Sequence, residues 1–229
     1  TREMSVNVVM VVLTVNGKRL GQNLKMVRVT DRRVIHPFKS PLLKTGGLAV
    51  LKGNLAPRGA ITKPAAIPED VRFFSGPAQV FDGEHPALKA LQAGKIKKGA
   101  VVVIRYEGPK GGPGMPEMFR FMKVLNGMGM AHEVALITDG RFSGSNNGCF
   151  VGHISPEAAE GGAIALIQDG DRILIHIPDR TLTVELSEKE MKRRRSLWKP
   201  PAPKIAKGYL ALYAKNASSA DQGAVVKWS

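Results

Sequence analysis

The order of apolar and polar residues along the chain predicts short strands and short helices. Residues 100–106 (AVVVIRY) give the clearest strand, because apolar, mostly β-branched residues follow one another there without a break. Residues 134–137 (VALI) predict a second buried strand. Between these strands, residues 116–129 carry apolar residues at helical spacing and predict an amphipathic helix. Pro116 suits its first position, and Glu117 suits its positive N-terminal end.

Further short elements are predicted on both sides of this stretch. Asp169-Gly170 is a turn signal that predicts a hairpin between two strands, and Ser187 with Glu190 has the spacing of a capping box at a helix start. Many strands with few helices indicate a mixed α/β domain built on a barrel. We expect strands over 6–15, 48–51, 75–81, 163–168, 172–177 and 181–186, and helices over 21–27, 85–93, 188–198 and 205–218.

The composition is that of a folded protein outside the membrane. With 43% hydrophobic residues among 229, the chain can bury a sizeable core. No apolar run approaches the roughly 20 residues of a membrane-spanning helix, and the apolar start lacks the cleavage site of a signal peptide. The single cysteine, Cys149, excludes an internal disulfide and a multi-cysteine metal or iron–sulfur site built from this chain alone. We therefore expect a soluble protein of a reducing compartment, with no membrane partner.

The start of the chain is the least regular part. Residues 31–47 are basic and interrupted by Pro37 and Pro41, which predicts a linker or an extended crossing segment. Because the first residue is Thr1 rather than methionine, we expect the chain to be a fragment or a processed product.

The net charge of +15 allows two interpretations. A strongly basic chain with a run such as Lys192-Arg193-Arg194-Arg195 is typical of nucleic-acid binding. A solvated basic face, or one that pairs with an acidic partner, gives the same charge. Aromatic residues make up only 6% of the chain, and no nucleic-acid-binding motif accompanies the charge. We therefore expect no nucleic-acid partner.

Two residues of the stretch 108–144 are candidates for chemistry. Glu117 is either a charge at a helix terminus or a ligand for a hard cation such as Mg²⁺. Ser143 lies in a turn after a predicted strand, where it is either an ordinary turn serine or an activated hydroxyl. The serine does not fit a nucleophile elbow, because Arg141 stands where that pattern needs glycine. A helix and a returning strand can bring Glu117 and Ser143 together.

The glycines of the same stretch also allow two readings. Gly111, Gly112 and Gly114 either expose backbone N–H groups to an anion or form a tight turn, and they fit no phosphate-loop pattern. The five histidines have no metal-ligand spacing.

Six segments carry a resemblance that covers nearly the whole chain, namely residues 13–24, 46–60, 108–118, 133–144, 152–173 and 198–225. These segments closely resemble the C-terminal half of the dihydroxy-acid dehydratase family, which includes 6-phosphogluconate and sugar-acid dehydratases. Phe142 in GRFSG and the SSADQGAV tail resemble the branched-chain enzyme more than the sugar-acid branch.

The resemblance implies a fold and a domain organisation. It implies an α/β fold in which a β-barrel-like, swivelling β/β/α domain with flanking helices closes over an N-terminal α/β domain. Residues 1–30 are then a junction segment from a missing N-terminal domain, and residues 31–229 are the C-terminal dehydratase domain.

The resemblance also implies an activity. The family's enzymes are hydro-lyases that dehydrate 2,3-dihydroxy-3-methyl acids to 2-oxo acids in branched-chain amino-acid biosynthesis. We expect this chain to be such a domain, inactive without its N-terminal half. A sugar-acid (aldonate or 6-phosphogluconate) dehydratase domain, and a non-catalytic stand-alone binding module of the same fold, are the alternatives.

Site residues, cofactors and partners follow from the same resemblance. By motif match, Glu117 falls on a Mg²⁺ ligand and Ser143 on the acceptor of the substrate's C2 proton, with Gly144 and Ser145 at the substrate. The family also uses an iron–sulfur cluster as Lewis acid, and Cys149 does not match a cluster ligand, so the cluster ligands are not in this chain. The expected partners are the N-terminal domain, a small hydroxy-acid substrate and a second copy in a homodimer. The expected location is the cytoplasm, or an organelle matrix in a eukaryote.

Overall fold

The computed structural model describes residues 9–143 and 147–227, and the chain divides into two compact units, 1–46 and 47–229. In the first unit, the short helix α1 (Leu20–Leu24) lies where the sequence predicts one. None of the described helices is long and apolar enough to cross a membrane.

The strand predicted over 6–15 is wrong for its described part. Within residues 9–15, only Leu13 makes a β-bridge, and its partner is Arg19 across a tight turn. Leu13 and Val15 remain largely exposed. An apolar run without neighbouring strands has neither a hydrogen-bonded ladder nor a core to hold it extended.

The second unit is built on one sheet. Among its described residues, eight strands lie in the order β1-β2-β6-β5-β4-β3-β7-β8. The central strands β3, β4, β5 and β6 run parallel, and the outer pairs are antiparallel. The strands are β1 (Ala49–Leu51), β2 (Gly59–Thr62), β3 (Phe73–Phe81), β4 (Val101–Ile104), β5 (Ala135–Thr138), β6 (Phe150–Ser155), β7 (Arg172–His176) and β8 (Thr181–Val184).

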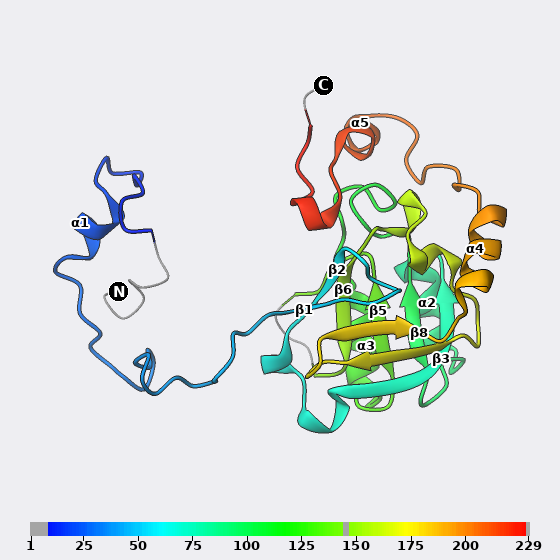
Figure 1. Cartoon of the computed structure of the whole chain (residues 1–229), viewed down its shortest axis with the longest axis horizontal. Coiled ribbons are helices and arrows are strands. Elements are labelled where there is room, and N and C mark those ends of the chain that lie inside the picture. Colours follow the sequence, from blue (N-terminus) through cyan, green and yellow to red (C-terminus); the bar gives the residue numbers. More distant parts are fainter. Residues whose placement is uncertain (1–8, 144–146, 228–229) are drawn as a thin grey trace. The chain divides into compact units, whose positions relative to one another are not determined.

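The two outer strands of this sheet approach each other and nearly close it into a barrel (Figure 1). The backbone N–H of Lys52 donates to the carbonyl of Arg180, and the N–H of Leu182 donates to the carbonyl of Lys52, both at 2.9 Å. The side-chain amide of Asn54 exchanges two hydrogen bonds with the backbone of Val184, at 2.8 and 2.9 Å. The expected barrel-like α/β fold with flanking helices is therefore confirmed.

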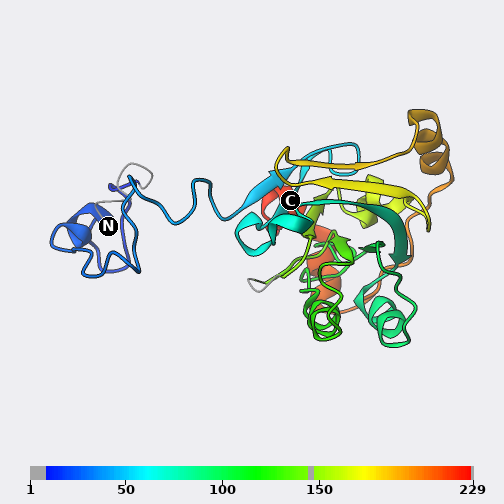
Figure 2. The same cartoon turned by 90° about the horizontal axis from the view of Figure 1, so that it is seen from below.

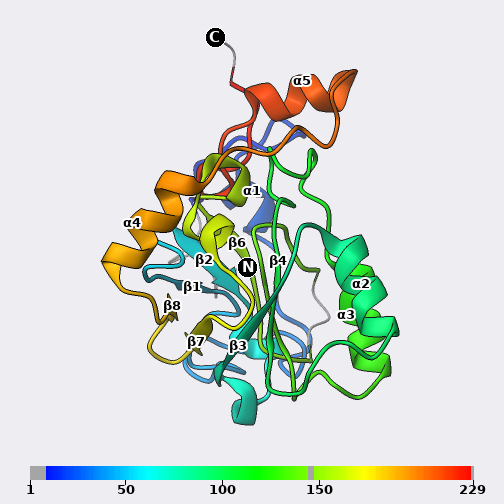
Figure 3. The same cartoon turned by 90° about the vertical axis from the view of Figure 1, so that its right-hand side faces the viewer.

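Helices cover the outside of the barrel. Figures 2 and 3 show α2 and α3 side by side on one face of the sheet. The α-helices of this unit are α2 (Glu84–Gln92), α3 (Phe119–Gly127), α4 (Glu188–Leu197) and α5 (Tyr209–Asn216). Single 3₁₀ turns are η2 (Pro64–Ala66), η3 (Glu69–Val71), η4 (Ala158–Glu160), η5 (Ala163–Leu166) and η6 (Ala220–Gln222).

Both faces of strand β4 are covered, which explains why its residues are apolar without alternation. Val101 and Val103 belong to the core inside the barrel. Val102 and Ile104 belong to a second core beneath α2 and α3, with Phe121 of α3. All four strand residues are fully buried, and each such side chain contributes about 1.5–3 kcal/mol to stability. A parallel strand covered on both faces needs apolar residues at every position.

The strand and hairpin predicted over 163–177 are wrong in their first half. The apolar run after Gly162 forms the 3₁₀ turn η5 instead, and β7 pairs with β3 and β8. At Gly162 the chain packs so tightly that a Cβ would lie 1.9 Å from the carbonyl oxygen of Pro156. The turn is buried on every side, and a short apolar run does not distinguish such a buried turn from a strand.

Candidate functional site

The two candidate segments leave the same edge of the sheet. Strands β4 and β5 are parallel neighbours, so their carboxyl ends lie together. The glycine-rich turn 108–114 follows β4, and residues 139–143 follow β5. In open α/β sheets this is the edge at which ligands bind.

Asp139 ties the two segments together. Its carboxylate is fully buried and accepts hydrogen bonds from the backbone N–H groups of Tyr106 (3.1 Å), Glu107 (2.9 Å) and Ala158 (2.8 Å). Burial raises the pKa of the Asp139 carboxyl, and the three donors oppose that shift. The residue fixes the turn after β4 against the turn after β5.

Glu157 holds the glycine turn from its other side. Its buried carboxylate accepts from the backbone N–H groups of Lys110 at 2.9 Å and Gly111 at 2.8 Å. A Cβ on Gly108 would lie 2.6 Å from the same carboxylate, which explains why glycine stands there. Burial raises the pKa of Glu157 to about 7. Of the two readings of the glycines, the structure supports the tight turn, because the N–H of Gly111 binds a carboxylate of the chain itself and the N–H of Gly112 donates to the carbonyl of Gly108 at 2.9 Å.

Glu117 lies beside the segment that follows β5. Its backbone forms a β-bridge with Arg141, and the N–H of Met118 donates to the carbonyl of Arg141 at 2.9 Å. This pairing extends the chain, so helix α3 begins at Phe119 and the prediction of a helix start at Pro116 is wrong. The Glu117 side chain is 35% exposed, with Oε1 3.5 Å from Nη1 of Arg141. Such an exposed ion pair is worth about 1 kcal/mol or less, which leaves the carboxylate available to a stronger partner.

Ser143 follows Arg141 by two residues and is partly buried. Its backbone carbonyl accepts a hydrogen bond from Nζ of Lys63 at 2.8 Å. The predicted substrate residues Gly144 and Ser145 lie outside the described residues. The β-bridge between Glu117 and Arg141 therefore places Glu117 and Ser143 on adjacent segments.

The side chains of Lys63 and Arg141 carry positive charge at this edge of the sheet, and both act on His153. The N–H of His153 in β6 donates to the carbonyl of Gly140 at 2.8 Å. The pKa of His153 is lowered, first by burial and then by the charges of Arg141 and Lys63. A small cavity of about 30 Å³ lies here, lined by Ile61, Thr62, Lys63, Phe142, Phe150, Gly152 and His153. The arrangement favours a negatively charged group next to Ser143.

The described residues offer few metal ligands. No group of three or more His, Cys, Asp or Glu side chains in this part of the chain is arranged to hold a metal. Glu117 fits one oxygen ligand of a hard cation. Cys149 does not fit an iron–sulfur ligand, because it is fully buried and burial raises its pKa to about 12, whereas a ligand must be a thiolate.

Several residues of this edge are not predictable from the chain's local pattern. Asp139 has a weak signal, since it directly follows an apolar strand, but its Asp-Gly pair is typical of an ordinary turn. Lys63 and Glu157 carry no signal, because they come from segments far from Ser143 and Gly108 in sequence.

The chain as a whole is similar to one known protein family and to proteins of known name. The family described as "Dihydroxy-acid/6-phosphogluconate dehydratase C-terminal" matches residues 33–224. A dihydroxy-acid dehydratase of Caldanaerobacter subterraneus subsp. tengcongensis is 53% identical over 94% of the chain. Those of Desulfatibacillum aliphaticivorans and Acetivibrio thermocellus are each 52% identical, over 93% and 94% of the chain. The chain spans 38–39% of the length of these relatives.

Proposed function

Because the chain belongs to the dihydroxy-acid/6-phosphogluconate dehydratase family, we propose that it is the C-terminal domain of a dihydroxy-acid dehydratase. The proposed enzyme is a hydro-lyase that converts 2,3-dihydroxy-3-methyl acids to 2-oxo acids in branched-chain amino-acid biosynthesis. Relatives of that name, about 50% identical over nearly the whole chain, support the substrate class. The observation that carries the proposal is the bridge between Glu117 and Arg141, which sets a carboxylate beside the loop of Ser143.

The reaction requires a base at the substrate's C2. The C2–H bond breaks as the base takes the proton, the hydroxyl of C3 leaves as hydroxide and gains a proton to form water, and an enol remains, so that the net loss from the substrate is the C2 proton and the C3 hydroxide. The enol becomes the 2-oxo acid when its hydroxyl proton is lost and C3 gains a proton. The base in this proposal is the Oγ of Ser143, which must first lose its own proton. The nearby positive charges of Lys63 and Arg141 favour the deprotonated oxygen and attract the substrate carboxylate.

Glu117 has a different role in this proposal. Its carboxylate would be one ligand of Mg²⁺, and the complete enzyme would supply the others. When bound, the cation supplies positive charge that acidifies hydroxyl groups near it. No step of the mechanism is assigned to an iron–sulfur cluster through this chain, because Cys149 does not fit a cluster ligand.

The remaining parts of the proposal concern the complete enzyme. Residues 1–30 form the junction to a preceding N-terminal domain, and residues 31–229 form the C-terminal domain; the family match from residue 33 supports this division. Gly144 and Ser145 contact the substrate. The complete enzyme is a cytoplasmic homodimer.

A substrate comparison tests the proposed function. The complete polypeptide that contains this chain, purified without oxygen, is assayed with 2,3-dihydroxyisovalerate, 6-phosphogluconate and an aldonate. We expect kcat/KM to be at least about tenfold higher for 2,3-dihydroxyisovalerate. The isolated chain, supplied with iron, sulfide and Mg²⁺, should show no turnover. If the enzyme preferred 6-phosphogluconate or the aldonate, a sugar acid would be its substrate class instead. If none of the three compounds were turned over, a non-catalytic binding module would be favoured.

A further inference from the structure

Strand β6 contains a β-bulge at His153. Ile61 of β2 pairs with Gly152 of β6. Gly59, two residues before Ile61, pairs with Ser155, three residues after Gly152, so β6 carries one extra residue between these two pairs. Bulges are common beside active sites, where the extra residue turns a side chain away from the regular alternation of its strand.

The backbone of the bulge is in an unfavourable conformation. His153 has a φ of +56°, in the left-handed region that glycine adopts freely and that other residues seldom adopt. Backbone strain of this kind is found mainly at functional sites, where the surrounding structure holds it in place. The strain therefore indicates a function for the side chain of His153, which a glycine at this position would lack.

His153 lies at the same edge of the sheet as Ser143. It lines the small cavity of about 30 Å³ together with Lys63 and Phe142. Phe142 directly precedes Ser143, and Nζ of Lys63 donates to the carbonyl of Ser143 at 2.8 Å. The N–H of His153 also donates to the carbonyl of Gly140 at 2.8 Å. These contacts fix the bulge of β6 against the segment that leads to Ser143.

The imidazole of His153 is neutral at neutral pH. Burial lowers its pKa, and the charges of Arg141, from the segment after β5, and of Lys63, from the segment after β2, lower it further. A neutral imidazole has a nitrogen lone pair that can take a proton. The same two cations disfavour the imidazolium, so a proton on this ring is readily passed on.

The carboxylates of this edge have other partners. Asp139 and Glu157 are buried and accept hydrogen bonds from backbone N–H groups of the turns that they hold. Glu117 is the proposed Mg²⁺ ligand. An acceptor for the proton of Ser143 needs an available lone pair beside that residue, which favours His153 over these carboxylates.

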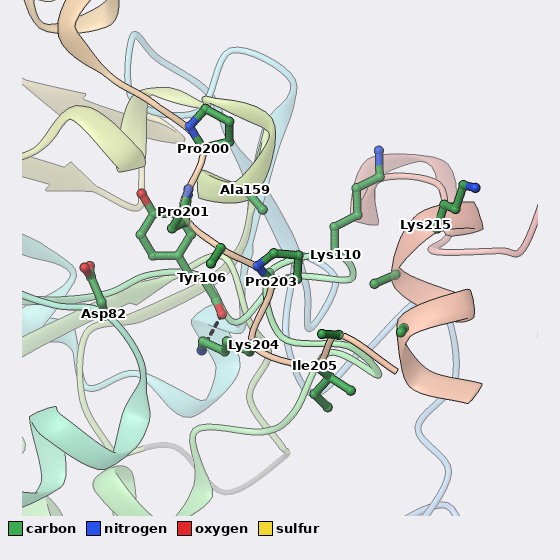
Figure 4. Close-up of a pocket in the computed structure, with 15 residues that line it drawn as sticks. Asp82, Tyr106, Lys110, Ala159, Pro200, Pro201, Pro203, Lys204, Ile205 and Lys215 are labelled. Atoms are coloured by element: carbon green, nitrogen blue, oxygen red, sulfur yellow. Dashed lines mark hydrogen bonds between the residues drawn. The ribbon is translucent and has the colours of Figure 1, made fainter. Parts of the chain in front are cut away.

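The described residues of a large cavity that borders the glycine turn offer no better acceptor. This cavity has a volume of about 670 Å³ (Figure 4), and its charged lining residues are three lysines and Asp82. Nζ of Lys204 donates to the carbonyl of Tyr106 at 2.6 Å, shown in Figure 4 as a dashed line. A protonated lysine has no lone pair, and the carboxylate of Asp82 pairs with Arg105 at 2.5 Å.

We propose that His153 is a further catalytic residue, whose imidazole takes the hydroxyl proton of Ser143 and returns it to the hydroxide that leaves C3 of the substrate. This inference rests on the proposed function, in which the Oγ of Ser143 is the base and must first lose its own proton. It adds the destination of that proton and the source of the proton that completes the water.

Protons and electron pairs balance in this cycle. The O–H bond of Ser143 breaks, its proton forms an N–H bond on His153, and an alkoxide remains. The alkoxide takes the C2 proton, the electron pair of the C2–H bond forms the C2=C3 double bond, and the electron pair of the C3–O bond leaves with hydroxide. The imidazolium then protonates the hydroxide to water. Ser143 is protonated again and His153 is neutral again, so both residues return to their starting states.

Chemical modification tests the pair without measuring activity. Diethyl pyrocarbonate modifies neutral imidazoles, and mass spectrometry of the complete polypeptide follows the rate at His153 as the pH is varied. The midpoint should lie below the ordinary pKa of 6.5. Ser143→Ala should raise it, because a hydroxyl that donates to the neutral ring favours the neutral form. His176 in β7 is the control and should not respond. An unchanged or lowered midpoint at His153 in Ser143→Ala would overturn the proposal.

Two replacements test the proton transfer in the complete polypeptide. His153→Asn suits the backbone, since asparagine tolerates a positive φ, but its amide cannot take up a proton, so kcat should fall at least about 10²-fold. His153→Gly removes the ring, and imidazole added to the buffer should restore part of the lost rate. Arg180→Gly is the matched control, because Arg180 has the same φ of +56° in the turn between β7 and β8. Its rate should equal that of the wild type, with or without imidazole.

The outcomes separate this inference from the proposed function. A His153→Asn enzyme that kept more than about a tenth of the wild-type rate would overturn the proposal, as would a His153→Gly enzyme that did not respond to imidazole. If the complete polypeptide turned over none of the acids while Ser143→Ala still raised the midpoint at His153, the pair would stand and the proposed reaction would fail. If the wild type were active and His153 did not respond to Ser143→Ala, the pair alone would fail.

Discussion

The carboxylate of Asp139 accepts a hydrogen bond from the backbone N–H of Glu107 at 2.9 Å, deep inside the molecule. Asp139 directly follows β5 and Glu107 lies three residues after the end of the neighbouring parallel strand β4, so the bond ties one turn of the candidate site to the other. The position of Glu117, which follows the first turn, and of Ser143, which follows the second, therefore depends on a buried group that does not itself face the site.

We expect Asp139→Asn to lower the free energy of unfolding of this chain by about 3 kcal/mol. The amide that replaces the carboxylate has one acceptor oxygen instead of two, and its NH₂ group faces backbone donors at a fully buried position. Urea denaturation measures the change. Asp169→Asn is the control, because Asp169 also accepts from a backbone N–H, that of Val80 at 2.7 Å, but at an exposed position. Equal losses for the two variants would contradict this role of Asp139.

The raised pKa of Glu157 predicts that stability depends on pH. The folded-state pKa is about 7 against an ordinary value of 4.5, so the folded protein holds a proton that the unfolded chain releases between these values. Stability should therefore fall as pH rises from about 4.5 to 7 and then level off, by up to about 3 kcal/mol. Glu157→Gln mimics the protonated side chain and should remove this part of the slope.

Urea denaturation at several pH values between 5 and 8 measures the slope. Glu160→Gln is a matched control from the same turn, because Glu160 binds the side chains of Lys110 and Arg58 rather than backbone groups. If Glu157→Gln left the pH profile of the wild type unchanged, the ionisation of Glu157 would not contribute to it.

In the complete enzyme, Ser143→Ala should lower kcat by at least about 10²-fold, because it removes the proposed base. The loss of stability should be about 1 kcal/mol or less, since the residue is only partly buried. Glu117→Gln should instead raise the Mg²⁺ concentration needed for half-maximal activity, because it removes a charged ligand.

Titration of activity with Mg²⁺ separates these two roles. Glu185→Gln is the control for Glu117, because Glu185 is also exposed and paired with an arginine, Arg172 at 3.9 Å. A Ser143→Ala enzyme that kept more than about a tenth of the rate would exclude this serine as the base. Ser145 would then be the next hydroxyl to test.

The chain should bind nucleic acid no more tightly than roughly micromolar at physiological salt. Most side chains of its densest basic run, residues 192–195, make ion pairs or hydrogen bonds within the fold. Arg194 pairs with Asp171 and Glu190, Arg193 pairs with Glu190, and Arg195 donates to the carbonyl of Gly161. Fluorescence anisotropy with labelled duplex and single-stranded DNA measures the affinity. Sub-micromolar binding would contradict the expectation.

Local sequence patterns correctly predicted those helices and strands that neighbouring residues determine. Helix α4 begins as expected, since the hydroxyl of Ser187 accepts from the N–H of Glu190 at 3.2 Å. Strands β4 and β5 lie where apolar runs predict them. The predictions failed where distant segments decide the conformation. Residues 163–168 turn instead of extending because they pack against the chain near Pro156, and α3 starts late because Arg141 pairs with Glu117.

The residues of the candidate site likewise divide into those that their own sequence motif predicted and those that it did not. Glu117 and Ser143 were predicted from their motifs, and their adjacent placement agrees with the expectation that a helix and a returning strand bring them together. Their roles in chemistry remain predictions. Lys63 and Glu157 were missed, because each reaches the site from a segment whose own sequence has no special pattern.

The closure of the barrel sets an order for its assembly on the ribosome. Asn54 finds its partner Val184 only after 130 further residues have been synthesised. At roughly 5–20 residues per second, the edge of β1 stays without this neighbour for about 6 to 26 seconds as the chain emerges. An unpaired strand edge is a template for association with other chains. The nascent domain is therefore most exposed to aggregation, and most in need of a chaperone, until β8 has left the ribosome.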